Sequence, residues 1–435
     1  MNFLTDNPRK LYTQFLLPSL GSALVMSIYS FVDTIAVGQS EGELGSAAMA
    51  VISPLYGVLV FLAILCGVGG SVLMSNARGE GNTEKGNACY TAALLVMGAL
   101  TAVFWAAFVL FHEGIFTFFG ADQDLMPKVM EYAKWIVWTF PVFIAPTFLG
   151  SFIRNDGAPN LVMAAVVIGG CVNMFGDWFL VFPMGMGMEG AAIATVIGTT
   201  LQVIIMCTHF FHKSCGLRLV RPNHMGRGIR GIFAIGFGAS ILDLGNVVIA
   251  IFMNNQIRRY GGTLELAVYG VLAAITPLFQ ALFCGVGQAI QPLVSTNHGA
   301  GDGQRVRAFW HYGLVTVLVM GTVFTALGEL LPTVITRLFM DAEPETLAIA
   351  PGIFRLYCPL FLFLGMTVLS TYYLQSTLRE SASTWIALLR SVIVSGALIF
   401  LLPLMLGMSG VWFALPLSEA IVATLALYYI KARAA

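Results

Sequence analysis

The sequence predicts an all-α membrane protein with twelve transmembrane helices, arranged as two six-helix bundles around a central cleft. Three observations predict this fold class: an apolar composition, twelve long apolar stretches, and a repeat that relates the two halves of the chain. Hydrophobic residues make up 58% of the chain and charged residues only 10%, whereas soluble domains carry about 25% charged residues. Lipid is therefore the expected solvent, and a formal net charge of zero gives no indication of a nucleic-acid partner.

Each apolar stretch is long enough to cross the hydrocarbon core of a bilayer, which takes about 20 residues. The twelve stretches are residues 11–38, 47–75, 88–111, 127–153, 160–182, 188–212, 229–257, 264–297, 306–331, 346–375, 382–403 and 408–430. Several contain proline or glycine, which bundle neighbours tolerate by satisfying the freed backbone groups. The polar N-terminus enters the first stretch without a small-residue cleavage site, so we expect a membrane helix there and no signal peptide.

The second half of the sequence repeats the first at an offset of about 220 residues. The segment GVGGSVLMSNARGEGN (67–82) is similar to GVGQAIQPLVSTNHGAGD (285–302), and GMEGAAIA (187–194) is similar to GMSGVWFA (407–414). Because each repeat contains an even number of helices, both enter the membrane from the same side. The repeats are therefore parallel, with a pseudo-twofold axis along the membrane normal, an arrangement that favours rocking of one bundle against the other.

The distribution of lysine and arginine predicts the orientation, because cytoplasmic loops are enriched in both. One set of helix ends holds most of the basic residues, while the opposite set is richer in acidic ones. Both termini are therefore expected on the cytoplasmic side of a bacterial inner membrane. We expect an N-lobe at 1–208 with six helices, a basic cytoplasmic linker at 209–228, and a C-lobe at 229–435 with the other six.

The cysteines and the linker histidines give no metal pattern in the sequence. None of the seven cysteines forms a CxxC pair or a Cys/His metal spacing, so we interpret them as small apolar residues. The linker histidines, which include His209 and His212, are interpreted as part of a solvated basic loop that faces lipid headgroups.

Five acidic residues fall within the predicted spans. A charge at bilayer depth costs at least about 2.5–3.5 kcal/mol on insertion scales, so such a residue usually has a partner or a function. The five are Asp33, Asp177, Asp243, Glu329 and Glu419. Asp243 and Glu419 fall near mid-depth and are candidates for contact with a substrate or a second ion, with structural hydrogen bonding as the alternative. Glu329 falls close to an outer helix end, where we expect it to be solvated.

Asp33 and Asp177 fall at a similar depth in the outer half of the membrane. Each is about five residues from the outer end of its helix, and Thr195 is about seven residues down from the outer end of another. At 1.5 Å per residue these three positions differ by a few ångströms in depth, and Asn173 lies one turn from Asp177 on the same helix face. Such oxygen donors suit Na⁺ or a shared proton. The sequence leaves open that they are instead separate, hydrated carboxylates near the headgroups.

The chain resembles the MATE (multidrug and toxic compound extrusion) family of the MOP superfamily, and in particular its bacterial MepA-type members. The resemblance covers nearly the whole chain. Beyond the repeated segments above, it is carried by PSLGSALVMSIYSFVDTIAVGQ (18–39), FIRNDGAPNLVM (152–163) and CVNMFGDWFLVFPMGMGMEGAAIAT (171–195). The order, spacing and duplication of these segments make the resemblance specific.

The resemblance implies a multidrug efflux antiporter that exports amphiphilic, cationic compounds in exchange for H⁺ or Na⁺. It implies no enzyme activity and no cofactor, and a cleft within one chain is consistent with a monomer. The family's cation-coupling residues fall on four positions of this sequence: Asp33, Asn173, Asp177 and Thr195. The family's helix-1 proline, which is linked to bending, falls on Pro18. The alternative is a lipid-linked saccharide flippase of the same superfamily, which needs interior basic residues; Arg355 and Arg390 are placed near helix ends.

Overall fold

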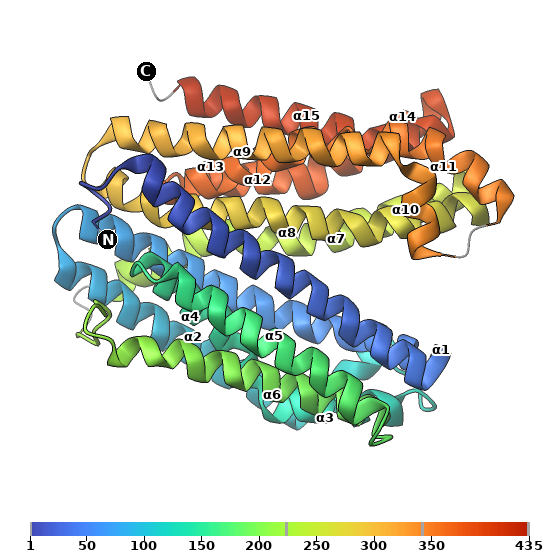
Figure 1. Ribbon diagram of the computed structural model, residues 1–435, viewed down its shortest axis with the longest axis horizontal. Helices are drawn as coiled ribbons and strands as arrows, with labels where there is room; N and C mark the ends of the chain where they lie inside the picture. Colours follow the sequence, from blue (N-terminus) through green and yellow to red (C-terminus); the bar gives the residue numbers. More distant parts are fainter. Residues whose placement is uncertain (1, 222–224, 341–342, 433–435) are drawn as a thin grey trace. The chain divides into compact units, whose positions relative to one another are not determined.

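The computed structural model describes residues 2–221, 225–340 and 343–432, and within these ranges the chain forms helices and no β-strand (Figure 1). An α-helix satisfies its own backbone hydrogen bonds, which an apolar chain in lipid requires. The chain divides into two compact units. Unit 1 comprises Met1–Asp6, Thr13–Gly236 and Gly299–Gly301, and unit 2 comprises Asn7–Tyr12, Phe237–His298 and Asp302–Ala435.

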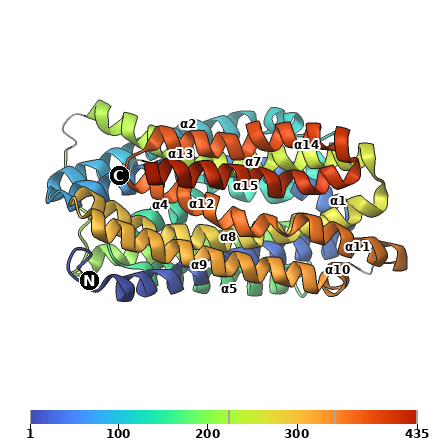
Figure 2. The same cartoon turned by 90° about the horizontal axis from the view of Figure 1, so that it is seen from above.

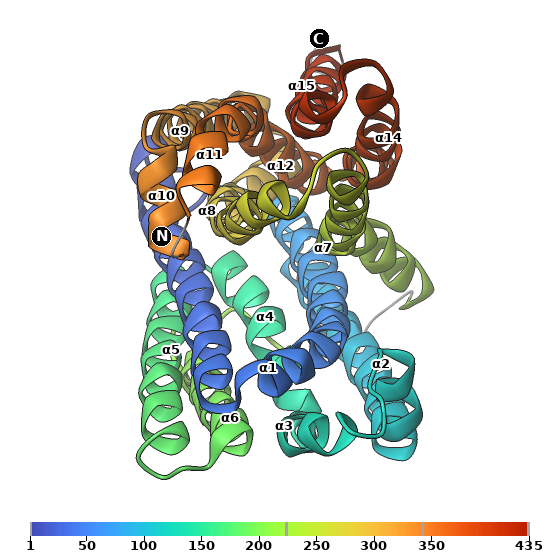
Figure 3. The ribbon, with the colours of Figure 1, turned by 90° about the vertical axis from the view of Figure 1, so that its right-hand side faces the viewer.

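The described residues of the N-terminal half form six α-helices and one short 3₁₀ helix, η1. They are α1 Pro8–Gly79, α2 Thr83–Phe118, α3 Met126–Trp138, α4 Phe140–Asn155, α5 Pro159–Val181, α6 Gly187–Cys207 and η1 Thr208–Phe211. α1 contains two spans, Pro8–Gly42 and Leu44–Gly79, which meet at a sharp turn (Figure 3). Gly42 forms this turn with φ 61° and ψ −138°, a conformation that glycine adopts without the steric cost of a Cβ atom.

The predicted single helix at 127–153 is instead a bent pair, α3 and α4, whose axes differ by 57°. The break falls just before Pro141, which lacks a backbone N–H and restricts the residue before it. When the pair is counted as one span, the described residues contain twelve candidate membrane spans. This number confirms the predicted fold class, and the stretch predicted at 127–153 corresponds to the bent pair.

In the C-terminal half, the part of the chain that the structure describes forms nine further α-helices and a π-helical stretch, η2. They are α7 Met225–Tyr260, α8 Thr263–Gly299, α9 Gly303–Leu330, α10 Pro332–Phe339, α11 Pro344–Tyr357, α12 Leu360–Ser376, α13 Glu380–Leu388, η2 Leu389–Ile393, α14 Val394–Leu406 and α15 Met408–Ala432. Within unit 2, α12 packs against both α9 and α15 (Figure 2). The short helix α10 was not among the predicted stretches, since eight residues do not cross a bilayer.

The repeat is visible in the turns that precede α2 and α9. Gly81 and Gly301 both have positive φ, 81° and 76°. The next residue in each case caps the following helix: Asn82 and Asp302 accept a hydrogen bond from the backbone N–H three residues on, at 2.8 and 3.0 Å. Such caps satisfy backbone donors that have no partner within the helix. The two turns therefore use the same chemistry at an offset of 220 residues.

The segment that follows α6 returns to unit 1. It begins in η1 with His209, whose exposed fraction is only 3%. The prediction of a solvated loop is wrong for this residue, because its imidazole reaches the buried carboxyl group of Asp156, which follows α4. Residues 222–224 of the predicted linker lie outside the described residues.

One apolar core of unit 1 lies among α1, α2, α3, α4, α5 and α6. Its fully buried members include Ile52, Phe140 and Met188. Tyr132 of α3 is packed in the same core, with an exposed fraction of 0%. This packing fixes the position of a phenol hydroxyl deep within the bundle, next to the first half of α1.

Candidate cation-binding site

The four predicted coupling residues come together in unit 1. Asp33 lies in the first half of α1, Asn173 and Asp177 lie one turn apart in α5, and Thr195 lies in α6. All four side chains are buried, with exposed fractions between 0% for Asp177 and 9% for Asp33. Three helices that are far apart in sequence therefore deliver two carboxyl groups, an amide and a hydroxyl to one buried region.

Close packing of α5 on α6 brings Asn173 to Thr195. A Cβ atom placed on Gly198 of α6 would lie 2.8 Å from the Cβ of Asn173 and 2.7 Å from the carbonyl oxygen of Gly169. Only glycine permits this approach, which is a common use of small residues between membrane helices. As a result, the Asn173 Nδ2 donates to Thr195 Oγ1 at 3.2 Å.

Thr195 links the amide to the first carboxyl group only weakly. Its Oγ1 lies 3.5 Å from Asp33 Oδ1 and 2.9 Å from the carbonyl oxygen of Ala191. A hydroxyl has one proton, and by distance the helix carbonyl is the better acceptor. The Thr195 oxygen is thus held with a lone pair available to the site.

A tyrosine that the sequence reasoning missed makes the shorter contact with Asp33. The hydroxyl of Tyr132 donates to Asp33 Oδ2 at 3.1 Å, and the hydroxyl of Tyr56 lies 3.1 Å from that of Tyr132. One signal in the sequence pointed to it: Tyr132 lies six residues after the start of α3 at Met126, a depth similar to that of Asp33. Tyr132 carries no charge, so the pattern of intramembrane acids does not indicate it.

The second carboxyl group has no such partner. Both carboxyl oxygens of Asp177 and the Oδ1 of Asn173 are buried and have no hydrogen-bond partner among the described residues. The Asp177 and Asp33 charges also interact with each other. A buried, unpaired carboxylate is strongly unfavourable, and its cost is relieved by a proton or by a cation. The unpartnered atoms are all oxygens, which hard cations such as Na⁺ accept as ligands.

Ion pairs join the helix ends next to this region. Lys128 of α3 lies 3.0 Å from both Glu41 and Glu131, and Lys134 lies 2.7 Å from Glu189 at the start of α6. The side chains are 21% to 40% exposed, so each pair contributes little stability. They nevertheless connect the turn of α1 near Gly42 to α3, and α3 to α6.

The remaining predicted positions are distributed over α1, α7, α9 and α15. The backbone of α1 is helical at Pro18, and Asp243 lies in α7 with its side chain outside the part of the chain that the structure describes. Glu329 is exposed at the end of α9. Glu419 of α15 is buried in unit 2, where its Oε1 lies 2.5 Å from Arg390 Nε.

The placement of Arg390 near a helix end is wrong. Arg390 lies ten residues into the span Glu380–Leu406 and is only 3% exposed. Its Nη2 also donates to Gln280 Oε1 at 3.0 Å. The guanidinium is accommodated inside the bundle because Glu419 neutralises its charge, a partner that the hydropathy of a single helix does not reveal.

Comparison with known proteins identifies the family. The profile of the MatE family matches residues 18–179 and 243–401, which is well over half of the chain. The chain is 24% identical over 437 residues to the multidrug export protein MepA of Staphylococcus aureus, covering 98% of this chain and 94% of that protein. It is 23% identical to MepA of Staphylococcus haemolyticus, covering 97% and 93%.

Solved structures show the same fold. An outward-facing conformation of a multidrug resistance MATE family transporter of the MOP superfamily superposes with a TM-score of 0.91 at 18% identity, covering 99% of this chain and 97% of the other. A MOP superfamily transporter from Pyrococcus furiosus gives a TM-score of 0.90 at 19% identity, with the same coverage. The chain therefore belongs to the MatE family of membrane transporters.

Proposed function

We propose that this transporter is an efflux antiporter that exports amphiphilic, cationic compounds in exchange for H⁺ or Na⁺. Family membership and relatives named as multidrug export proteins support efflux. One observation carries the coupling proposal: the Asp177 carboxyl oxygens and the Asn173 amide oxygen are buried without a partner in the described chain. An entering cation or proton supplies the missing partner.

The coupling ion binds among Asp33, Asn173, Asp177 and Thr195. If the ion is H⁺, it neutralises one carboxyl group, and if it is Na⁺, the side-chain oxygens replace part of its hydration shell. Occupancy then favours whichever conformation binds the ion better, and this differential affinity drives the change of state. The first half of α1 carries both Asp33 and Pro18, so bending at Pro18 is the proposed response of that helix to ion binding.

The substrate is proposed to be cationic because the buried arginine within the described spans, Arg390, is already neutralised. The guanidinium of Arg390 is paired with Glu419, so it offers no free positive charge to an anionic substrate. The same pairing weighs against the lipid-linked saccharide flippase, whose headgroup needs unpaired basic residues. We further propose that the protein acts as a monomer in a bacterial plasma membrane, with both termini cytoplasmic, in accordance with the basic helix ends.

The test is dye efflux from proteoliposomes in which either a pH gradient or a Na⁺ gradient is imposed. The gradient that drives efflux identifies the coupling ion. We expect Asp33→Asn and Asp177→Asn to abolish the gradient-driven component, while the matched control Glu329→Gln, an exposed carboxyl at the end of α9, retains it. Full gradient-driven efflux in both Asp variants would overturn the coupling proposal, and preferred export of anionic dyes would overturn the substrate class.

A further inference from the structure

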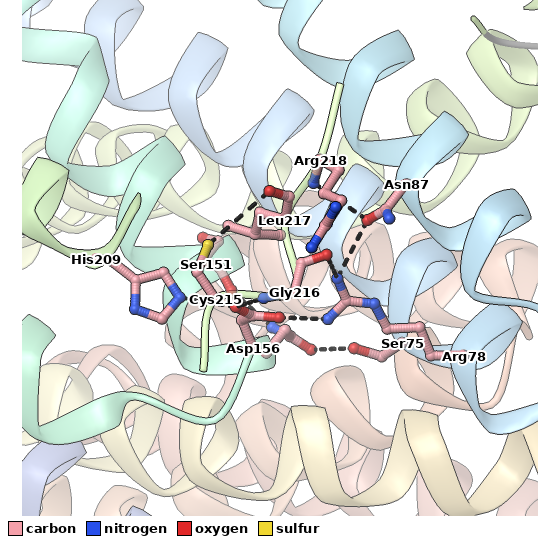
Figure 4. A network of polar contacts seen from close by, with 11 residues as sticks. Ser75, Arg78, Asn87, Ser151, Asp156, His209, Cys215, Gly216, Leu217 and Arg218 are labelled. Carbon is pink, nitrogen blue, oxygen red and sulfur yellow. Dashed lines mark hydrogen bonds and ion pairs between the residues drawn. The ribbon is translucent and has the colours of Figure 1, made fainter. Parts of the chain in front are cut away.

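A second group of polar side chains lies in unit 1, away from the site above, where α4 and α6 end (Figure 4). Asp156 follows α4, His209 lies in η1, and Cys215 lies in the segment after η1. One nitrogen of His209, the sulfur of Cys215 and one carboxyl oxygen of Asp156 all lie within 4.8 Å of one another. Among the residues that the structure describes, this is the one group of three or more such side chains with metal-ligand spacing.

The three side chains come together because the segment after α6 folds back onto the end of α4. His209 Nε2 lies 2.7 Å from Asp156 Oδ2, and the backbone N–H of Gly216 donates to the same oxygen at 2.9 Å. The side chains of His209 and Asp156 are each 3% exposed, and Cys215 is half-buried. The group is therefore largely shielded from solvent yet reachable through the cysteine.

Arg78 orients the carboxyl group. Its Nη1 lies 2.5 Å from Asp156 Oδ1, while its Nη2 bonds the carbonyl oxygen of Gly216 at 2.8 Å and Asn87 Oδ1 at 3.2 Å. Burial raises the pKa of Asp156, but the hydrogen bond with His209 and the charge of Arg78 outweigh it, so its pKa lies below the ordinary value. Oδ2 is left directed toward the histidine. Metal-binding carboxylates are commonly held in this way by an outer hydrogen-bonding partner.

Nitrogen, sulfur and oxygen from His, Cys and Asp form a donor set that suits Zn²⁺, which binds all three at about 2.0–2.3 Å in tetrahedral geometry. Tetrahedral angles place such ligand atoms about 3.3–3.8 Å apart. The 2.7 Å between His209 Nε2 and Asp156 Oδ2 is shorter than this range, and all three ligand atoms lie within 4.8 Å of one another. The His209–Asp156 pair opens slightly to admit the ion, and Cys215 moves slightly inward. A carboxylate and a thiolate together offset the charge of Zn²⁺, while Arg78 remains on the other carboxyl oxygen of Asp156.

We propose that Asp156, His209 and Cys215 bind Zn²⁺, with water as the fourth ligand, and that the ion fastens the segment after α6 to the end of α4. This site is separate from the coupling site, and it does not depend on the proposed antiport. Its effect is structural: the ion replaces a set of hydrogen bonds with metal–ligand bonds that join two connections of the same bundle.

The test uses the full-length protein, purified in detergent and stripped of metal with a chelator. Co²⁺ serves as a spectroscopic probe, because a thiolate ligand gives a charge-transfer band in the near ultraviolet. We expect one equivalent of Co²⁺ to bind, Zn²⁺ to displace it, and Zn²⁺ to raise the unfolding temperature. Cys215→Ser abolishes the charge-transfer band, and His209→Gln weakens binding by at least about tenfold.

Matched controls come from the same stretch of chain. Cys207→Ser removes a half-buried thiol eight residues earlier, and His212→Gln removes an exposed imidazole three residues after His209. Both are expected to bind Co²⁺ as the unmodified protein does. Failure of the folded, unmodified protein to bind either metal overturns the proposal, as does a charge-transfer band that survives in Cys215→Ser. Because Cys215→Ser changes one atom of a half-buried side chain, it keeps the test valid if His209→Gln does not fold.

Discussion

The buried acidic residues of the two units differ in whether they have a basic partner. In unit 1, Asp33 and Asp177 are buried together, and neither has a cationic partner among the described residues. In unit 2, Glu419 is equally buried, but Arg390 lies 2.5 Å away and Gln280 binds the other side of the guanidinium. The acid group of unit 1 therefore lacks a counter-charge, while that of unit 2 carries its own.

This difference predicts different roles for the buried acidic residues of the two units. An isolated buried carboxylate is costly enough that it recruits a proton or a cation, which is what a coupling site requires. A buried ion pair is neutral as a whole and has no need of an incoming ion. The comparison therefore favours Asp177 over Glu419 as a site of coupling, even though both are single acids within apolar helices.

The largest expected effect follows from removing the unpaired charge. Asp177→Asn keeps the size and burial of the side chain but cannot exchange a proton or bind a cation by charge. We expect gradient-driven dye efflux to fall by more than about 100-fold, the equivalent of about 3 kcal/mol of lost charge stabilisation. Efflux rates in proteoliposomes measure this loss, with Glu419→Gln compared in parallel.

The assignment of coupling to unit 1 is wrong if Glu419→Gln abolishes coupling while Asp177→Asn preserves it. In that case unit 2 would hold the coupling acid, and Arg390 would have to release it during transport. Equal retention of coupling in the two variants would place the coupling ion elsewhere in the molecule.

The next largest effect concerns stability. Glu419→Leu leaves the Arg390 guanidinium buried without its counter-charge, which should cost about 3–5 kcal/mol in the free energy of unfolding. Arg390→Met combined with Glu419→Leu removes both charges with similar side-chain volumes, so most of this loss should be recovered. Denaturant unfolding in detergent measures both changes.

Efflux by the double variant tests whether the pair of Arg390 and Glu419 has only a structural role. A structural ion pair predicts that gradient-driven efflux survives when both charges are removed together. If the double variant is stable but uncoupled, Glu419 has a role in ion transfer that its pairing with Arg390 conceals.

The grouping of the four proposed coupling residues could be predicted from the sequence. Apolar length gives the span ends, and a fixed helical rise converts a position in a span into a depth, which placed Asp33, Asp177 and Thr195 at one level. The residues that face a given side chain from other helices cannot be predicted in this way, because they depend on how the helices pack. For this reason Tyr132, which contacts Asp33, was not predicted.

The errors have the same physical origin. Arg390 was placed near a helix end because hydropathy alone makes an interior arginine too costly, whereas its partner is 29 residues away on another helix. His209 was assigned to a solvated loop because its buried partner, Asp156, follows a different helix and is 53 residues away in the sequence. Contacts formed where connections fold back are set by tertiary structure and leave no periodic signal.

A smaller effect is expected when the hydroxyl of Tyr132 is removed. Tyr132→Phe takes away the 3.1 Å hydrogen bond to Asp33 but leaves the ring packed in the core. Hydrogen bonds to charged groups are worth about 1.5–3 kcal/mol, so the half-saturating concentration of the coupling ion should change by at least about tenfold. The matched control is Tyr56→Phe, which removes the hydroxyl that lies 3.1 Å from that of Tyr132 and should change this concentration less. An equal change in the two variants would mean that the phenols act as a pair.

The smallest effect is expected when a charge is removed from the ion pairs at the helix ends. This change tests whether the affinity for the coupling ion depends on the buried carboxyl groups or on the charges around them. Lys128→Gln removes a positive charge that two half-exposed carboxylates already balance. Because exposed pairs contribute about 0–1 kcal/mol and are screened by salt, the half-saturating ion concentration should change less than about fivefold. The change should be toward tighter cation binding, it should diminish as salt is raised, and Lys134→Gln should behave alike. A large effect that persists at high salt would mean that the helix-end charges, and not the buried carboxyl groups alone, set the affinity for the ion.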